Sequence, residues 1–146
     1  MNHPALTLGY RLEADGVSVV YACYHEPHSR QYALGTGAMS EQDRQHVDFL
    51  KHADLVIHDA QYTAEEQISR ASYGHSTADC AIGLAQQCGA ELLVLFHHNP
   101  QHTDADVSAI EAASATAKGV EVRAAREGNI ISIGGTSRTY STDGAA

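Results

Sequence analysis

The stretch Leu93-Val-Leu-Phe-His-His-Asn-Pro-Gln-His-Thr-Asp104 indicates the fold more strongly than any other part of the chain. Its short apolar run predicts a buried strand of a parallel sheet that ends near Phe96. Open α/β folds bind ligands at the carboxyl ends of such strands. Imidazole binds zinc-like metals and titrates near neutral pH, so the histidines after the run indicate metal binding or proton transfer. The alternative is that Phe96 packs while the histidines cap the strand and face water.

Strand and helix patterns alternate outward from this stretch. Asp15-Gly16 suits the positive φ angles of a tight turn and predicts a β-hairpin of residues 6–14 and 17–23. Helices are predicted to start at Ser40, after the capping residue Thr63, in the segment that opens with residues 73–77, and at Thr103 or Asp104. Further strands are predicted at residues 54–60, 92–96, 120–124 and 129–133. The expected fold class is therefore α+β, with a mixed, mainly parallel sheet covered by helices. Residues 1–134 are expected to form one partial domain and residues 135–146 a flexible tail.

Composition limits the classes of function. The 146 residues can bury one ordinary core. A net charge of -9 with scattered basic residues argues against binding of a long nucleic acid. No long apolar stretch predicts a membrane span. Cys23, Cys80 and Cys88 form no Cys-x-x-Cys pair, which favours a reducing compartment and a cytoplasmic protein with thiols that act as small buried hydrophobes.

Histidines and acids gather at several predicted strand ends. Tyr24-His25-Glu26 follows the second strand, His58-Asp59 the third, and His97-His98 the fourth, while His75 opens a helix. Because these ends meet at one edge of a sheet, a shared site is expected. His25 and His28 are the loop histidines expected to line a pocket. His46 and His52 lie at neither i+3 nor i+4 spacing on one helix, so they are expected to be solvated surface residues.

The ordered motifs resemble a known family. Val-Val-Tyr-Ala-x-x-His-Glu-Pro, Leu-Val-Ile-His-Asp-Ala-Gln-Tyr, Gly-His-Ser-Thr-Ala and Leu-Phe-His-His are similar to the carboxyl-terminal half of metallo-β-lactamase-fold hydrolases. The ribonuclease Z-like and phosphoribosyl cyclic phosphodiesterase-like branch is the most similar. The resemblance implies an αββα fold and a zinc- or manganese-dependent hydrolase that acts on a phosphodiester.

The resemblance also implies roles for individual residues. His97 matches a metal ligand, and His75 matches a histidine that contacts the phosphate or protonates the leaving group. Asp59 matches an acid that could orient His75. His25 and His98 are expected at the substrate.

Two departures from the family pattern affect the expected activity. The His-x-His-x-Asp-His motif does not occur, so the chain is expected to lack most metal ligands and to be weakly active or inactive alone. Tyr24 stands where the family has a metal-bridging aspartate, and a neutral tyrosine cannot replace that carboxylate. Glu26 is not expected to compensate.

Two function classes remain open. One is a phosphodiesterase-like hydrolase, present as a carboxyl-terminal portion and acting on a small phosphodiester or nucleotide-like substrate. The other is a non-catalytic binding or assembly module. Either way, an exposed apolar sheet face predicts self-association or a complementary amino-terminal half.

Overall fold

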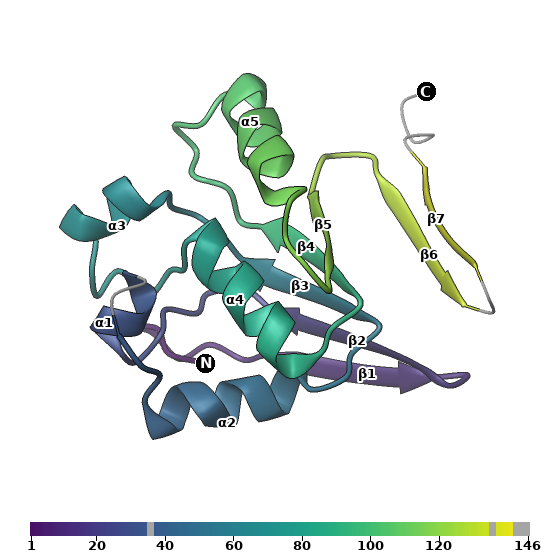
Figure 1. Cartoon of the computed structure of the whole chain (residues 1–146), viewed down its shortest axis with the longest axis horizontal. Coiled ribbons are helices and arrows are strands. Elements are labelled where there is room, and N and C mark those ends of the chain that lie inside the picture. The colour runs from purple at the N-terminus through teal and green to yellow at the C-terminus, as the bar shows by residue number, and fades with distance from the viewer. Residues whose placement is uncertain (35–36, 135–136, 142–146) are drawn as a thin grey trace.

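The computed structural model describes residues 1–34, 37–134 and 137–141. Seven strands and five helices lie within this part of the chain (Figure 1). The strands are β1 (Tyr10–Ala14), β2 (Val17–Ala22), β3 (Leu55–Asp59), β4 (Leu92–Phe96), β5 (Glu121–Ala124), β6 (Ile130–Gly134) and β7 (Ser137–Ser141). The helices are α1 (Arg30–Ala33), α2 (Glu41–Leu50), α3 (Ala64–Ser69), α4 (Ala78–Cys88) and α5 (Asp104–Ser114).

Five strands form the main sheet in the order β1-β2-β3-β4-β5. The β1 and β2 strands pair antiparallel as the predicted hairpin, and the remaining neighbours pair parallel. Asp15 and Gly16 adopt φ angles of 53° and 77° in the turn, as their sequence predicts. The expected mixed, mainly parallel sheet is therefore confirmed. Its parallel strands all point their carboxyl ends to one edge, where the histidines and acids gather.

Local capping residues determine where the helices begin and end. Ser40 and Thr63 form capping boxes with Asp43 and Glu66, and each box satisfies backbone donors that the helix leaves free. Thr77 caps α4, and Gly89 ends it in the left-handed conformation at φ 68°. The predicted helix starts at Ser40 and Thr63 and the predicted end at Gly89 are confirmed.

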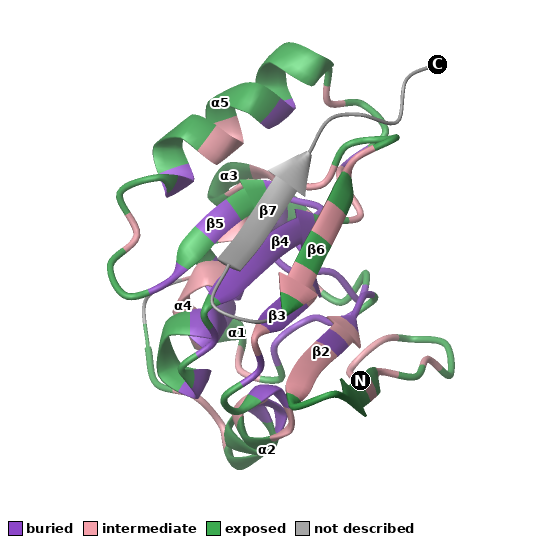
Figure 2. Ribbon diagram, turned by 90° about the vertical axis from the view of Figure 1, so that its right-hand side faces the viewer, coloured by how far each residue is buried: buried purple, intermediate pink, exposed green. Residues whose placement is uncertain are grey.

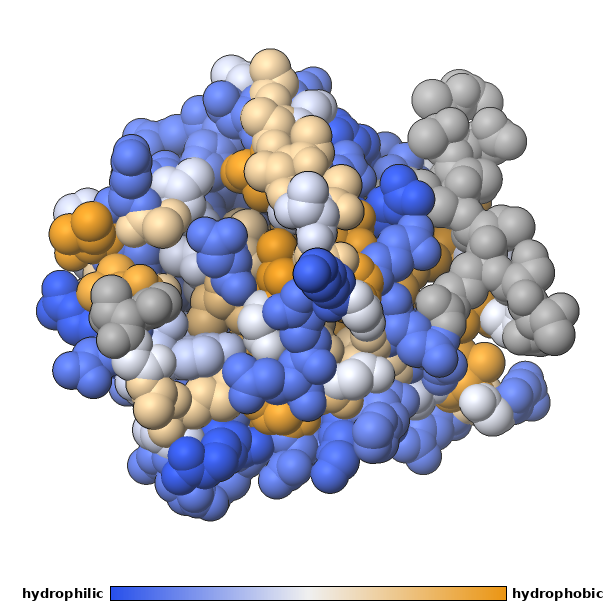
Figure 3. Space-filling model, in the orientation of Figure 1, coloured by the Kyte–Doolittle hydropathy of each residue, from blue (hydrophilic) through white to orange (hydrophobic). Residues whose placement is uncertain are grey.

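The main core lies between the sheet and the helices. It includes Val20, Val56, Leu93 and Leu95 from the strands and Leu84 from α4, all essentially inaccessible to solvent. Figure 3 shows this helix-covered side of the molecule, where hydrophilic residues alternate with a band of apolar residues along α5 and several smaller apolar patches. The three cysteines are buried and unpaired, as their apolar surroundings predict.

The opposite face of the sheet is apolar and only partly covered. Leu55, Leu92 and Val94 form a second small core with side chains of β6, which lies over this face (Figure 2). Tyr10 and Leu12 of β1 remain 53% and 63% exposed. The sheet therefore offers an apolar surface that the described residues do not fully bury.

Two segments differ from their predicted structure. The first strand begins at Tyr10 rather than at residue 6, and Leu6 is 96% exposed, so it gains no packing that would extend the strand. The expected tail includes β7, whose backbone pairs antiparallel with β6. Hydrogen bonding to β6 compensates for the weak strand pattern of Ser137–Ser141. Its flexibility stays a prediction, and residues 135–136 and 142–146 lie outside the described residues. Among the described residues, no helix is long and apolar enough to cross a bilayer.

Candidate functional site

Asp59 lies at the centre of the cluster at the carboxyl edge of the sheet. It ends β3, and its side chain is fully buried. Its Oδ2 atom accepts hydrogen bonds from the backbone N–H groups of Tyr24 and His25, and its Oδ1 atom accepts from those of Gln61 and Ser76. Four backbone donors from three separate segments therefore hold one carboxylate and fix its position.

His75 and His97 face each other beside this carboxylate. His75 Nδ1 lies 2.7 Å from Asp59 Oδ2, close enough for a strong hydrogen bond that places the proton on Nδ1. The rings of His75 and His97 stack with centroids 4.8 Å apart and an interplanar angle of 13°. Gln61 Nε2 lies 2.9 Å from His97 Nδ1 and fixes the orientation of that ring. Burial lowers the pKa of His97, so its imidazole is neutral at pH 7.

Tyr24 completes this side of the cluster. Its φ of 64° is uncommon for a bulky residue, and the ring lies 4.5 Å from that of His97. The side chain is 40% exposed, so a phenol group stands at the opening where the resemblance places a carboxylate. The structure therefore provides no carboxylate at this position.

Glu26 stabilises the loop that carries His75. Its Oε1 atom accepts from the backbone N–H of Ser72, and its Oε2 atom accepts from that of Gly74, both at 2.8 Å. Ser72 and Gly74 have left-handed φ angles of 71° and 93°, and Glu26 holds this turn in place. Its carboxylate is thereby directed to the loop and away from the position of Tyr24.

The two remaining predicted site residues lie outside the cluster of Asp59, His75 and His97. The His25 ring is 2% exposed and stacks on His46, although its backbone N–H reaches Asp59. The ring nitrogens of His98 are buried, and burial lowers the pKa of this side chain. Substrate contact by either side chain stays a prediction.

His46 corrects one expectation directly. It is 7% exposed, stacks on His25 with centroids 3.6 Å apart and contacts His58, so the prediction of a solvated surface residue is wrong. The helix α2 buries Asp43, His46 and Leu50, a face with spacings of three and four residues. This helical spacing is the feature of the sequence that indicates a buried position for His46. Gln61 was also missed, because a glutamine after a strand carries no pattern of its own.

The donor set of this cluster can be compared with what a metal requires. One donor atom each from Asp59, His75 and His97 lies within 4.8 Å of the others. However, both oxygens of Asp59 already accept hydrogen bonds, and each imidazole uses Nδ1 in a polar contact. Two Nε2 atoms remain, whereas a catalytic zinc takes about three protein ligands. This cluster therefore does not complete a catalytic metal site by itself.

Comparisons with known proteins agree with the resemblance read from the sequence. The chain is 39% identical over 58 residues to ribonuclease Z of Thermoplasma volcanium and 35% identical over 60 residues to that of Brevibacillus brevis. These matches cover 40% and 41% of this chain and 19% of each relative. No protein-family model matches the chain.

A solved structure shows the same fold. The metallo-β-lactamase fold protein YhfI from Bacillus subtilis is similar with a TM-score of 0.59 at 21% identity, over 85% of this chain and 43% of YhfI. The chain therefore has a metallo-β-lactamase fold and resembles part of ribonuclease Z, as predicted. It matches less than half the length of each of these proteins.

Proposed function

We propose that this chain, which has a metallo-β-lactamase fold, forms the carboxyl-terminal portion of a metal-dependent phosphodiester hydrolase. The observation that carries the proposal is the pairing of buried Asp59 with His75 at the carboxyl edge of the parallel strands. Relatives named ribonuclease Z support a phosphodiester as the substrate class. The net charge of -9 favours a small phosphodiester or nucleotide-like substrate over a long RNA.

His75 is the residue proposed to act on the substrate. Its Nδ1 proton is committed to Asp59, so Nε2 is the nitrogen that can give a proton to a leaving oxygen or accept one. Asp59 fixes the tautomer and stabilises the imidazolium that forms. His97 is proposed as a metal ligand through Nε2, which requires the ring proton on Nδ1 and the Gln61 amide turned so that its oxygen accepts from Nδ1–H. Zinc or manganese, bound by a complete ligand set, would supply an activated water.

The missing ligands are proposed to come from residues that cover the open sheet face. Asp59 of β3 and Phe96 of β4 are paired in register, and each comes directly after the apolar side chains that its strand presents on this face. The site therefore borders the apolar surface. A complementary amino-terminal half that packed on this surface would reach the site edge. A second copy of the chain is the other way to cover it.

A non-catalytic binding or assembly module is the second candidate. Tyr24 favours this second candidate, because a neutral phenol stands next to His97 in place of a carboxylate and would weaken metal binding there. Such a module would keep the fold and the apolar face but would turn over no substrate.

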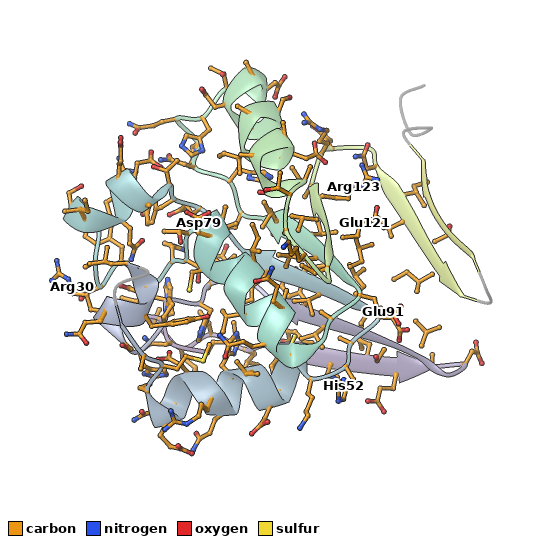
Figure 4. All side chains as sticks on the ribbon, viewed as in Figure 1. Arg30, His52, Asp79, Glu91, Glu121 and Arg123 are labelled. Carbon is orange, nitrogen blue, oxygen red and sulfur yellow. The ribbon has the colours of Figure 1, made fainter. Side chains whose placement is uncertain are left out.

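Metal content and turnover separate these two functions. We expect slow hydrolysis of bis-p-nitrophenyl phosphate with added zinc or manganese, which is lost in His97→Ala and in His75→Ala. His52→Asn provides a control because His52 is exposed beyond the end of α2 (Figure 4). Absence of metal-dependent turnover both in the wild-type chain alone and in its mixture with an amino-terminal half that carries His-x-His-x-Asp-His would contradict the hydrolase and favour the binding module.

A further inference from the structure

Three buried histidines form a second cluster on the helix-covered side of the sheet. His25 follows β2, His46 lies on α2, and His58 lies on β3, with exposures of 2%, 7% and 0%. Side chains alternate along a strand, so His58 and its neighbour Asp59 point to opposite faces. The three histidines, here called the histidine triad, are therefore separate from the cluster of Asp59, His75 and His97.

The hydrogen bond of His58 fixes which of its nitrogens is free. His58 Nδ1 lies 2.8 Å from the backbone oxygen of Asp59, and since a carbonyl only accepts, Nδ1 carries the proton. The lone pair of His58 is therefore on Nε2, inside the triad. A ring N–H that donates to a backbone carbonyl is the usual outer contact of a metal-binding histidine.

The spacing of the triad suits a small cation. His46 Nε2 lies 3.0 Å from His58 Nε2, close to the separation of two neighbouring ligands on one ion with bonds of about 2.0–2.1 Å. One donor atom from each of the three histidines lies within 4.8 Å of the others. His25 Nε2 is buried and has no hydrogen-bond partner in the part of the chain that the structure describes, so one polar atom of the triad is left unsatisfied there.

We propose that the histidine triad is a binding site for a first-row divalent cation such as zinc, with Nε2 atoms of His25, His46 and His58 as ligands. Imidazole donors without a carboxylate suit zinc, copper and nickel better than magnesium or calcium. A pocket lined by Met1, Gly9, His28, Gln42, Gln45 and Phe49 leads to His25 and His46 and offers an entry path.

Coordination requires two proton shifts within the triad. Without metal, His46 Nε2 donates to His58, and His25 Nδ1 accepts from the backbone N–H of Asn2 at 3.2 Å. When the cation binds, each of the His25 and His46 rings changes tautomer, so that Nε2 loses its proton while Nδ1 gains one by exchange with solvent, and the His25 ring turns away from its stack. The contact with Asn2 is then lost. Metal binding should therefore release the backbone around Asn2 to faster amide exchange.

Burial keeps the triad histidines unprotonated, so that their nitrogen lone pairs are available to a cation. It lowers the pKa of all three triad histidines, with a further decrease for His25 and His46 from neighbouring histidines and the terminal amine. The triad is therefore uncharged at neutral pH and does not repel a cation. A cation of this kind would tie α2 to the ends of β2 and β3.

Cobalt titration of chelator-treated protein tests the site. In the His97→Ala background, which removes the other cluster, we expect about one equivalent of Co²⁺ to bind with visible d–d absorption. Addition of His46→Gln should abolish this binding, whereas addition of His52→Asn should leave it unchanged. Equal binding with and without His46→Gln, or no binding at all, would overturn the proposal. Neither result depends on hydrolytic activity, so this experiment tests the histidine triad independently of the proposed function.

A measurement on the wild-type chain covers the case in which His46→Gln does not fold. Histidine-labelled protein should show zinc-dependent shifts of the ring ¹⁵N resonances of His46 and His58. Amide exchange around Asn2 should become faster upon the same addition. Ring resonances that do not move at saturating zinc would contradict the site.

Discussion

His75 Nδ1 lies 2.7 Å from Oδ2 of Asp59, although the two residues are 16 positions apart in the chain. The same carboxylate oxygen accepts from the backbone of Tyr24 and His25, and the other from Gln61 and Ser76. Through Asp59, the orientation of the His75 imidazole therefore depends on the backbone of three segments. A change at Asp59 should therefore affect stability as well as chemistry.

Replacement of Asp59 by alanine should lower the free energy of unfolding by about 3 kcal/mol, because several buried donors lose their acceptor. Urea denaturation measures the effect. Asp48→Ala, at an exposed position on α2, should change stability by less than about 0.5 kcal/mol. A small effect of Asp59→Ala, equal to that of Asp48→Ala, would show that the donors find other partners.

Replacement of Glu26 by alanine should release the turn before His75. Ser72 and Gly74 would lose their acceptor, at a cost of about 1–3 kcal/mol for the buried donors. Amide exchange at residues 72–76 should become faster while exchange in β4 stays slow. Glu65→Ala, on the exposed side of α3, is the matched control. Protection of residues 72–76 that equals the wild type would argue against this role of Glu26.

Replacement of Tyr24 by aspartate should strengthen metal binding at His97. A carboxylate replaces the phenol next to that ring, and aspartate tolerates a left-handed φ better than tyrosine does. We expect affinity for manganese or zinc to rise about tenfold over the wild type in a calorimetric titration. Tyr24→Asn introduces a side chain with nearly the shape of aspartate but without its charge, and it should give no such gain in affinity. Equal affinities of the two variants would refute an electrostatic origin.

The open sheet face should drive self-association of the isolated chain. Leu12→Glu places a charge on this face and should shift the protein toward monomer in sedimentation velocity at high concentration. Leu6→Glu adds the same charge at a residue outside the sheet and should leave association unchanged. A wild-type chain that stays monomeric throughout would contradict this expectation.

Stability should fall as the pH decreases below about 6.5 in chelator-treated protein. Burial lowers the folded-state pKa of His25, His46 and His58, so the unfolded chain binds protons that the folded chain does not. The stabilising effect is complete above the unfolded pKa and is lost progressively below it, by about 1.4 kcal/mol per pH unit for each proton. Urea denaturation between pH 5.5 and 8 measures the slope, and His46→Gln should reduce it by about one proton. A flat profile over this range would mean that the buried histidines do not resist protonation.

Local signals in the sequence predicted the elements well. The Asp15-Gly16 turn, the caps at Ser40 and Thr63, and the stop at Gly89 each depend on a few neighbouring residues, and all are present. The strand β7 was not predicted, because its backbone gains from pairing with β6 and not from an apolar pattern.

The site was predicted only as a set of strand ends. The sequence placed Asp59, His75 and His97 at one edge, since parallel strands align their ends. It could not show that Gln61 holds His97 or that His46 is buried against His25, because these contacts join residues 21 to 36 positions apart. Histidine suits both solvent and a buried polar contact, so its type alone does not decide between them.

The parallel pairing of β2, β3 and β4 has a consequence for folding order. The contacts of Asp59 with Tyr24 and of His75 with His97 join segments that meet only when β2, β3 and β4 pair through helical crossovers, so local hairpin or helix formation does not assemble them. Closing those long loops costs entropy before the contacts form. The Asp59 cluster should therefore assemble late in folding, and the chemical environment of His75 should report when the native sheet is complete.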